Sequence, residues 1–209
     1  MSRKIKYYFA LTSTWAYVGY PAFADLVKRN NLEVEYRPLP LHDLFDSTGG
    51  LPLPKRSITR QNYRIQELQR WREKRGLKFN LYPKHWPLKN SIADRVVLAA
   101  LANGQDVHPL LLQFFTSIWE KEADLSDLDT IVALADKAGF DGKLLAKQAD
   151  NPEIEKQYQD NLQDAVESGV YGSPSVILDG ELFWGQDRLE ALEEAITSGR
   201  APYGIPARP

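Results

Sequence analysis

The chain of 209 residues contains no cysteine. Without a thiol it forms no disulfide, no thiolate metal site and no redox dithiol of its own. Any thiol chemistry at this protein therefore takes its sulfur from a bound ligand. The sequence has three histidines, His42, His85 and His108, which are widely separated and form no ligand motif, so we expect no metal site.

Long apolar runs and an excess of one charge are also lacking. No stretch approaches the roughly 20 apolar residues of a membrane span, and the first residues lack the apolar core and cleavage site of a signal peptide. The formal net charge of -2 gives no case for nucleic acid or an anionic membrane as a partner. Since 43% of the residues are hydrophobic, the chain has enough apolar material for a core. We therefore expect a cytoplasmic globular protein.

The N-terminal part alternates between strand and helix patterns. Residues 5–11 form a continuous apolar run, typical of a central strand that is buried on both faces. A helical pattern begins near Trp15, and residues 32–39 then alternate between apolar and polar side chains. The order strand, helix, strand predicts a parallel pair of strands with a right-handed crossover.

The middle of the chain has a different character. Residues 38–54 are rich in Pro, Gly and Asp and are predicted to form a long loop. From about residue 57 to residue 169 the spacing of apolar side chains predicts helices and no strand. Two capping boxes are expected to start helices in this block, Ser91 with Asp94 and Ser126 with Asp129.

The C-terminal part returns to strands. Residues 175–178 and 181–184 flank Asp179-Gly180, a strong signal for a two-residue hairpin. Asp187 and Glu190 have the spacing of a third capping box, which predicts the start of a final helix.

This order of elements predicts an α/β thioredoxin-like fold with a large all-helical insertion. The thioredoxin-like domain is expected to combine residues 1–45 with 165–199. The helical insertion domain would occupy residues 46–164, and residues 200–209 would form a C-terminal tail.

Two loops are candidates for a ligand site. Ser13 lies where the first strand passes into a helix, and the N–H groups and dipole of a helix N-terminus favour an anion there. The turn before Ser173-Pro174 is rich in glycine, and in this fold we expect a cis proline. That geometry would leave the main-chain N–H and C=O of Ser173 free for an extended peptide-like ligand. Both loops would lie at the carboxyl ends of strands, where ligands bind in α/β sheets.

Three segments carry a specific resemblance: Tyr8-Phe9 with Ser13-Thr14-Trp15-Ala16-Tyr17, then Gly172-Ser173-Pro174, then the run 179–189, DGELFWGQDRL. Together they resemble the 2-hydroxychromene-2-carboxylate isomerase family, which is related to kappa-class glutathione transferases and more distantly to DsbA-like oxidoreductases. The resemblance spans nearly the whole chain. The chain departs from common family residues at Ala10, Thr14, Leu51 and Ser173.

The resemblance implies that Ser13 contacts the sulfur of glutathione, since a serine takes the place of the first redox cysteine in this family. Lowering a thiol pKa by about two units from 8.5 requires about 2.7 kcal/mol. One charge-assisted hydrogen bond and a helix N-terminus together are of that order. The alternative role for Ser13 is a helix cap alone.

The remaining glutathione contacts also follow from the resemblance. Ser173 and Pro174 would pair with the peptide backbone of glutathione, and Gln186 and Asp187 would hold its γ-glutamyl end. Arg60 would bind the glycyl carboxylate. Lys55 or Arg56 could bind this carboxylate in place of Arg60, or all three could belong to a solvated basic stretch without a ligand. The alternative role for Gln186 and Asp187 is a helix cap. The tryptophans and tyrosine that are candidates for an aromatic pocket, or for core packing, are Trp15, Tyr82, Trp86 and Trp184.

The activity implied by the resemblance is a glutathione-dependent isomerisation of 2-hydroxychromene-2-carboxylate or similar unsaturated aromatic 2-oxo acids. The glutathione thiolate would act as a transient nucleophile that adds, allows bond rotation and leaves. The alternatives are a kappa-type transferase that conjugates electrophiles and a glutathione-binding module without turnover. The resemblance also implies a homodimer.

Overall fold

The computed structural model describes residues 3–88 and 91–205. In this part of the chain the sheet runs in the order β2-β1-β3-β4. Its strands are β1 Lys4–Phe9, β2 Glu33–Pro38, β3 Ser175–Leu178 and β4 Glu181–Trp184. β1 pairs in parallel with β2, as predicted, while β3 runs antiparallel to both β1 and β4. The sheet is therefore that of a thioredoxin-like fold.

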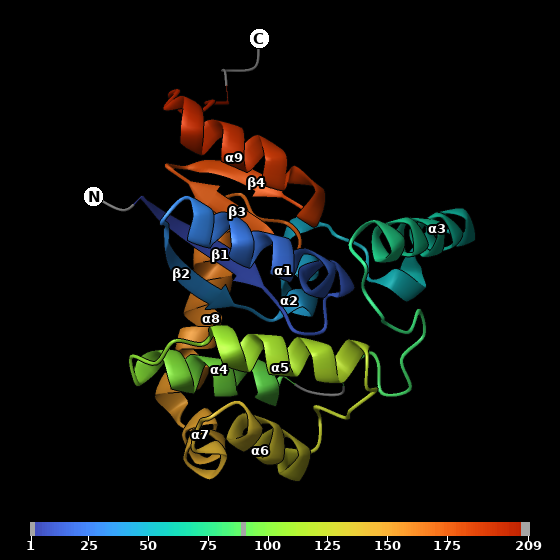
Figure 1. Cartoon of the computed structure of the whole chain (residues 1–209), viewed down its shortest axis with the longest axis vertical. Helices are drawn as coiled ribbons and strands as arrows, with labels where there is room; N and C mark the ends of the chain where they lie inside the picture. Colours follow the sequence, from blue (N-terminus) through green and yellow to red (C-terminus); the bar gives the residue numbers. More distant parts are fainter. Residues whose placement is uncertain (1–2, 89–90, 206–209) are drawn as a thin grey trace.

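Helices cover both faces of the sheet. Tyr7 and Phe9 of β1 lie in the main core together with residues of α1 Thr14–Arg29 and α9 Leu189–Ser198. Figure 1 shows both helices beside the sheet. Tyr8 points the other way, into a smaller core with residues of α8 Pro152–Glu167 and α2 Leu41–Thr48. All three side chains are buried, which confirms that β1 is buried on both faces.

The helical block lies between β2 and β3 in the sequence. Besides α2 and α8 it contains α3 Ile58–Lys74, α4 Ile92–Ala102, α5 His108–Trp119, α6 Leu128–Lys137 and α7 Gly142–Ala149. The described residues of this block form no strand, as predicted. Figure 1 shows α4 to α7 stacked along one side of the sheet, with α3 standing out from the body. The main core runs from Tyr7 through Phe115 of α5 to Ile131 of α6 without a break. The division into two domains stays a prediction.

The predicted hairpin between β3 and β4 is confirmed. Asp179 and Gly180 both have positive φ, 51° and 85°, as the two-residue turn requires. Leu178 pairs with Glu181 in the ladder. The described residues include no helix that is long and apolar enough to cross a bilayer.

The prediction of a long loop over residues 38–54 was wrong. This segment contains α2 and the start of a short 3₁₀ turn, Leu53–Lys55. Leu44 of α2 is fully buried and packs in the smaller core beside Leu162 and Val166 of α8. Tertiary contact, rather than local sequence, therefore stabilises this helix.

The capping boxes were also wrong in detail. Ser91 precedes α4 but makes no side-chain cap, and Asp127 rather than Ser126 caps α6, accepting from the N–H of Thr130. Asp187 lies in a 3₁₀ turn, Gln186–Arg188, which comes before α9. Asp94 does not cap α4, because its carboxylate accepts hydrogen bonds from Leu11 and Tyr158 instead.

Candidate active site

Ser13 lies at the junction of β1 and α1 and is buried, with 6% of its surface exposed. It is the N-cap of α1, because its Oγ accepts a hydrogen bond from the N–H of Ala16 at 3.2 Å. The same hydroxyl donates to the carbonyl oxygen of Ser173 at 2.9 Å. Ser13 is thus a helix cap that also contacts the second predicted loop, and its contact with the sulfur of glutathione stays a prediction.

The second loop contains the cis peptide bond that was predicted between Ser173 and Pro174. The expectation that the Ser173 carbonyl is free was wrong, because it accepts from Ser13. A buried carbonyl requires a donor, and the Ser13 hydroxyl is within reach. The Ser173 side chain accepts from the N–H of Ala10 at 3.1 Å. Within the described residues the main-chain N–H of Ser173 makes no hydrogen bond, so this donor is available to a ligand.

The third segment lies beside Pro174. The N–H of Gly185 donates to the carbonyl oxygen of Pro174 at 2.9 Å, which places Gln186 and Asp187 next to the Ser173-Pro174 loop. Asp187 is exposed and pairs with Arg188 at 3.1 Å. Its carboxylate is therefore accessible to a ligand.

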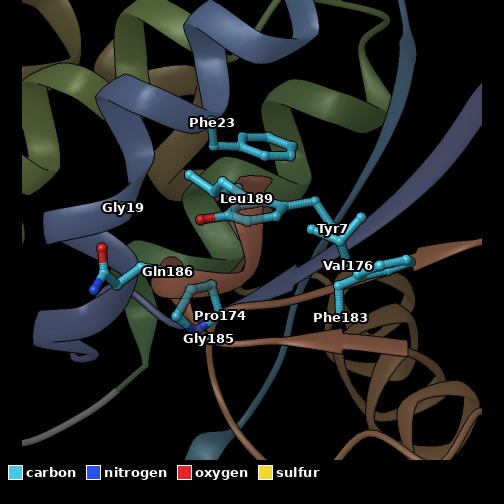
Figure 2. Close-up of a pocket in the computed structure, with 9 residues that line it drawn as sticks. All are labelled: Tyr7, Gly19, Phe23, Pro174, Val176, Phe183, Gly185, Gln186 and Leu189. Carbon is cyan, nitrogen blue, oxygen red and sulfur yellow. The ribbon is translucent and has the colours of Figure 1, made fainter. Parts of the chain in front are cut away.

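Gln186, by contrast, is buried and packs closely on α1 at Gly19. A Cβ atom added at Gly19 would lie only 2.6 Å from the Cβ of Gln186, which is too close. Its Oε1 has no hydrogen-bond partner among the described residues. Gln186 lines a small cavity together with Gly19 and Pro174, and Figure 2 shows its amide beside Gly19. The volume of the cavity is about 10 Å³, at most the space that one water molecule needs. This cavity is therefore too small for a tripeptide.

Two residues for which the sequence predicted other roles, Asp94 and Trp86, hold the Ser13 loop in place. Asp94 of α4 accepts from the N–H of Leu11 at 3.0 Å and from the hydroxyl of Tyr158 at 2.9 Å. Burial raises the pKa of Asp94 to about 7. Trp86 donates from its indole Nε1 to the carbonyl oxygen of Thr12 at 2.8 Å. The sequence spacing of Asp94 predicted a capping box and not this contact with Leu11. Only the packing of α4 in the folded chain brings the Asp94 carboxylate to Leu11.

Helix α3 contributes basic groups to the same edge. Arg60 is exposed, and among the described residues no carboxylate lies within ion-pair distance of it. Arg64, one turn further along α3, donates from Nη2 to the Thr14 hydroxyl at 2.6 Å. Arg56 donates to the carbonyl oxygen of Leu51 at 2.7 Å. The structure therefore brings α3 to the residue after Ser13, through Arg64 rather than through Arg60.

The aromatic candidates separate into two groups. Trp15 and Trp86 pack against the main core. Trp184 is half exposed and pairs with Tyr171, with ring centroids 4.7 Å apart, and Tyr82 is exposed. The described residues hold no group of His, Asp and Glu side chains suited to a metal ion.

The chain belongs to the family of the DSBA-like thioredoxin domain, whose model matches residues 4–197. Among curated proteins it is similar to a 2-hydroxychromene-2-carboxylate isomerase from Sphingobium xenophagum, with 26% identity over 195 residues, covering 92% of this chain and 97% of that protein. It is also similar to glutathione S-transferase kappa 1 from Homo sapiens, with 22% identity over 232 aligned positions, covering 100% of this chain and 98% of that protein.

Among solved structures, a 2-hydroxychromene-2-carboxylate isomerase superposes with a TM-score of 0.80 at 20% identity, covering 93% of this chain and 95% of the other. The predicted thioredoxin-like fold and the predicted relationship to this group of proteins are thus confirmed. At this level of identity the structural likeness establishes the fold.

Proposed function

We propose that this chain is a glutathione-dependent isomerase of 2-hydroxychromene-2-carboxylate or similar unsaturated aromatic 2-oxo acids. The observation that carries the proposal is the Ser13 hydroxyl, held at the N-terminus of α1 against the main chain of Ser173 in a chain without cysteine. The isomerase relatives, aligned over nearly the full chain, support the reaction class. The kappa transferase relative supports glutathione as the cofactor.

The residues around Ser13 fit an extended tripeptide. The unpaired N–H of Ser173 suits a peptide carbonyl, and the exposed carboxylate of Asp187 suits the γ-glutamyl ammonium group. Arg60, exposed and without an ion pair among the described residues, suits the glycyl carboxylate. Gln186 is proposed as a neighbour of the γ-glutamyl end, although its side chain is buried. When bound, glutathione supplies the nucleophilic thiolate that this chain lacks.

The Ser13 hydroxyl donates its one hydrogen bond to the Ser173 carbonyl. A ligand amide N–H that takes over this carbonyl would free the hydroxyl to donate a hydrogen bond to the thiolate instead. The Ala16 N–H would still hold the Ser13 oxygen in place. A hydrogen bond to a charged group contributes about 1.5–3 kcal/mol, and the N-terminus of α1 contributes about 0.3–1 kcal/mol. Together they lower a thiol pKa by about two units.

Calorimetric titration with glutathione tests the first half of the proposal, and an absence of binding would contradict it. The second half is tested with a panel of aromatic 2-oxo acids in the presence of glutathione. Isomerisation changes the substrate spectrum while the free-thiol concentration stays constant. A fall in free thiol that matches product formation identifies instead a kappa-type transferase, and binding without any turnover identifies a binding module.

We also propose that the chain forms a homodimer, as the resemblance implied. Light scattering coupled to gel filtration tests this directly. A mass of one chain, about 23.8 kDa, at micromolar concentration would contradict the homodimer.

A further inference from the structure

Three arginines follow one another at four-residue intervals, Arg56 just before α3 and Arg60 and Arg64 within it. Among the described residues, no carboxylate lies within ion-pair distance of any of them. Burial lowers the pKa of Arg56, and the charge of Arg60 adds to that effect. Burial likewise lowers the pKa of Arg64 to about 10, with a further contribution from Arg56. Like charges that gather without a counter-charge create a site for an anion.

Arg64 is the member of this group that reaches the candidate active site. Its guanidinium donates to Thr14 and lies over the ring of Trp86, 5.5 Å from the centroid. Trp86 in turn donates to Thr12. Thr12 and Thr14 flank Ser13 in the sequence. Arg64 is therefore oriented by both neighbours of Ser13, directly by Thr14 and through Trp86 by Thr12. Within the described part of the chain, Thr14 accepts the single hydrogen bond that Arg64 donates, which leaves most of its five donors for a ligand.

We propose that Arg64 binds the carboxylate of the electrophilic substrate and so makes the enzyme selective for acids. The inference rests on the proposed function, because Ser13 marks the position of the reacting sulfur. In a 2-oxo acid the carboxylate is bonded directly to the carbonyl carbon, so it must lie close to the atoms that react. The guanidinium fork matches a carboxylate in two parallel hydrogen bonds. Arg60, one turn away and exposed, remains for the more distant carboxylate of glutathione.

The test compares binding of an unreactive aromatic carboxylate, cinnamate, with binding of its neutral counterpart, cinnamamide. Both are titrated into the full chain with and without glutathione, and the quenching of tryptophan fluorescence is followed. Wild type is expected to bind the carboxylate more tightly than the amide. Arg64→Met is expected to weaken carboxylate binding about tenfold or more and to leave amide binding unchanged. Arg64→Lys keeps the charge without the fork and should fall between the two.

Arg70→Met is the matched control, because it removes the same charge from an exposed position on the same helix. It should change neither affinity. Equal affinity of wild type for the two compounds, or an equal loss in Arg64→Met and Arg70→Met, would overturn the proposal. Urea unfolding of each variant checks that the fold is retained.

A second readout separates this role from an effect on the cofactor. The pKa of the thiol of bound glutathione, followed by thiolate absorbance, should rise less in Arg64→Met than in Ser13→Ala, because Arg64 acts on the thiolate only as a nearby charge. If Arg64→Met raises that pKa as much as Ser13→Ala does, Arg64 acts on the sulfur and the proposal is wrong. Failure of glutathione to bind would contradict the proposed function, whereas the ratio of carboxylate to amide affinity, measured without glutathione, tests Arg64 separately.

Discussion

The N-terminus of α1 and helix α3 meet where Arg64 donates to Thr14. The two sides of this contact differ in how much of their surface is buried. On the α1 side, Ser13 and Thr14 are buried, and Ser13 is held by Ser173 from a distant part of the sequence. On the α3 side, Leu68 is the only buried residue of the helix. The difference indicates that the α1 side is assembled before any ligand binds. The α3 side carries Arg56, Arg60 and Arg64, which pair with no carboxylate among the described residues.

Leu68→Ala should have the largest effect on stability, and it tests whether the α3 side is held more weakly than the α1 side. Because Leu68 is the one buried anchor of the helix, its truncation should lower the free energy that holds α3 in place by about 2–5 kcal/mol. Native-state hydrogen exchange should report this as faster exchange of α3 amides, with those of β1 unchanged. Ile58→Ala at an exposed position of the same helix is the control and should change little. Equal effects of the two variants would show that α3 is held elsewhere.

The pH dependence of stability tests the α1 side through Asp94. Because burial raises the pKa of Asp94 from 3.8 to about 7, the native state holds a proton that the unfolded state has released between these pH values. The free energy of unfolding should therefore fall as pH rises through this window, by at most about 1.4 kcal/mol per pH unit from this group. Above the native pKa the contribution is constant.

Asp94→Asn keeps an acceptor for Leu11 and a polar partner for Tyr158, but it does not titrate. Urea unfolding at several pH values should therefore show a shallower fall in this variant than in wild type. Identical pH profiles would mean that Asp94 has an ordinary pKa in the folded protein.

Ser13→Ala should raise the thiol pKa of bound glutathione by one to two units, because a charge-assisted hydrogen bond contributes about 1.5–3 kcal/mol. Thiolate absorbance across a pH titration measures this. The variant also loses the cap of α1, at a cost of about 1 kcal/mol in unfolding free energy. Ser13→Thr retains the hydroxyl and is the control. A thiol pKa that is the same in the Ala variant as in wild type would leave Ser13 as a helix cap only.

Asp187→Ala should have the smallest effect, since this carboxylate is exposed. We expect glutathione to bind about fivefold more weakly, a change of about 1 kcal/mol that is typical of a solvated ion pair. Calorimetry measures the affinity, and Asp187→Asn tests whether charge is required. Because the side chain pairs only with neighbouring Arg188 among the described residues, the urea midpoint should stay constant. An unchanged affinity would remove Asp187 from the site.

Local patterns predicted the parts of the fold that depend on few neighbours. The hairpin at Asp179-Gly180 was predictable because two residues with positive φ define the turn. Helix α2 was not, since its burial depends on Leu44 meeting α8, more than a hundred residues away. The cap at Ser91 failed for a related reason, because Asp94 is used by Leu11 and Tyr158 instead.

By itself the sequence determined the class of chemistry open to this protein. A chain without cysteine must take any thiol that it uses from a ligand, and the Ser13 and Ser173-Pro174 motifs predict where such a ligand would bind. Only the tertiary structure decided which groups share that place. Ser13 satisfies the Ser173 carbonyl, and Arg64 reaches Thr14 from a helix fifty residues away in the sequence. Hydrogen bonds between distant segments depend on how the elements pack, and no local spacing encodes that packing.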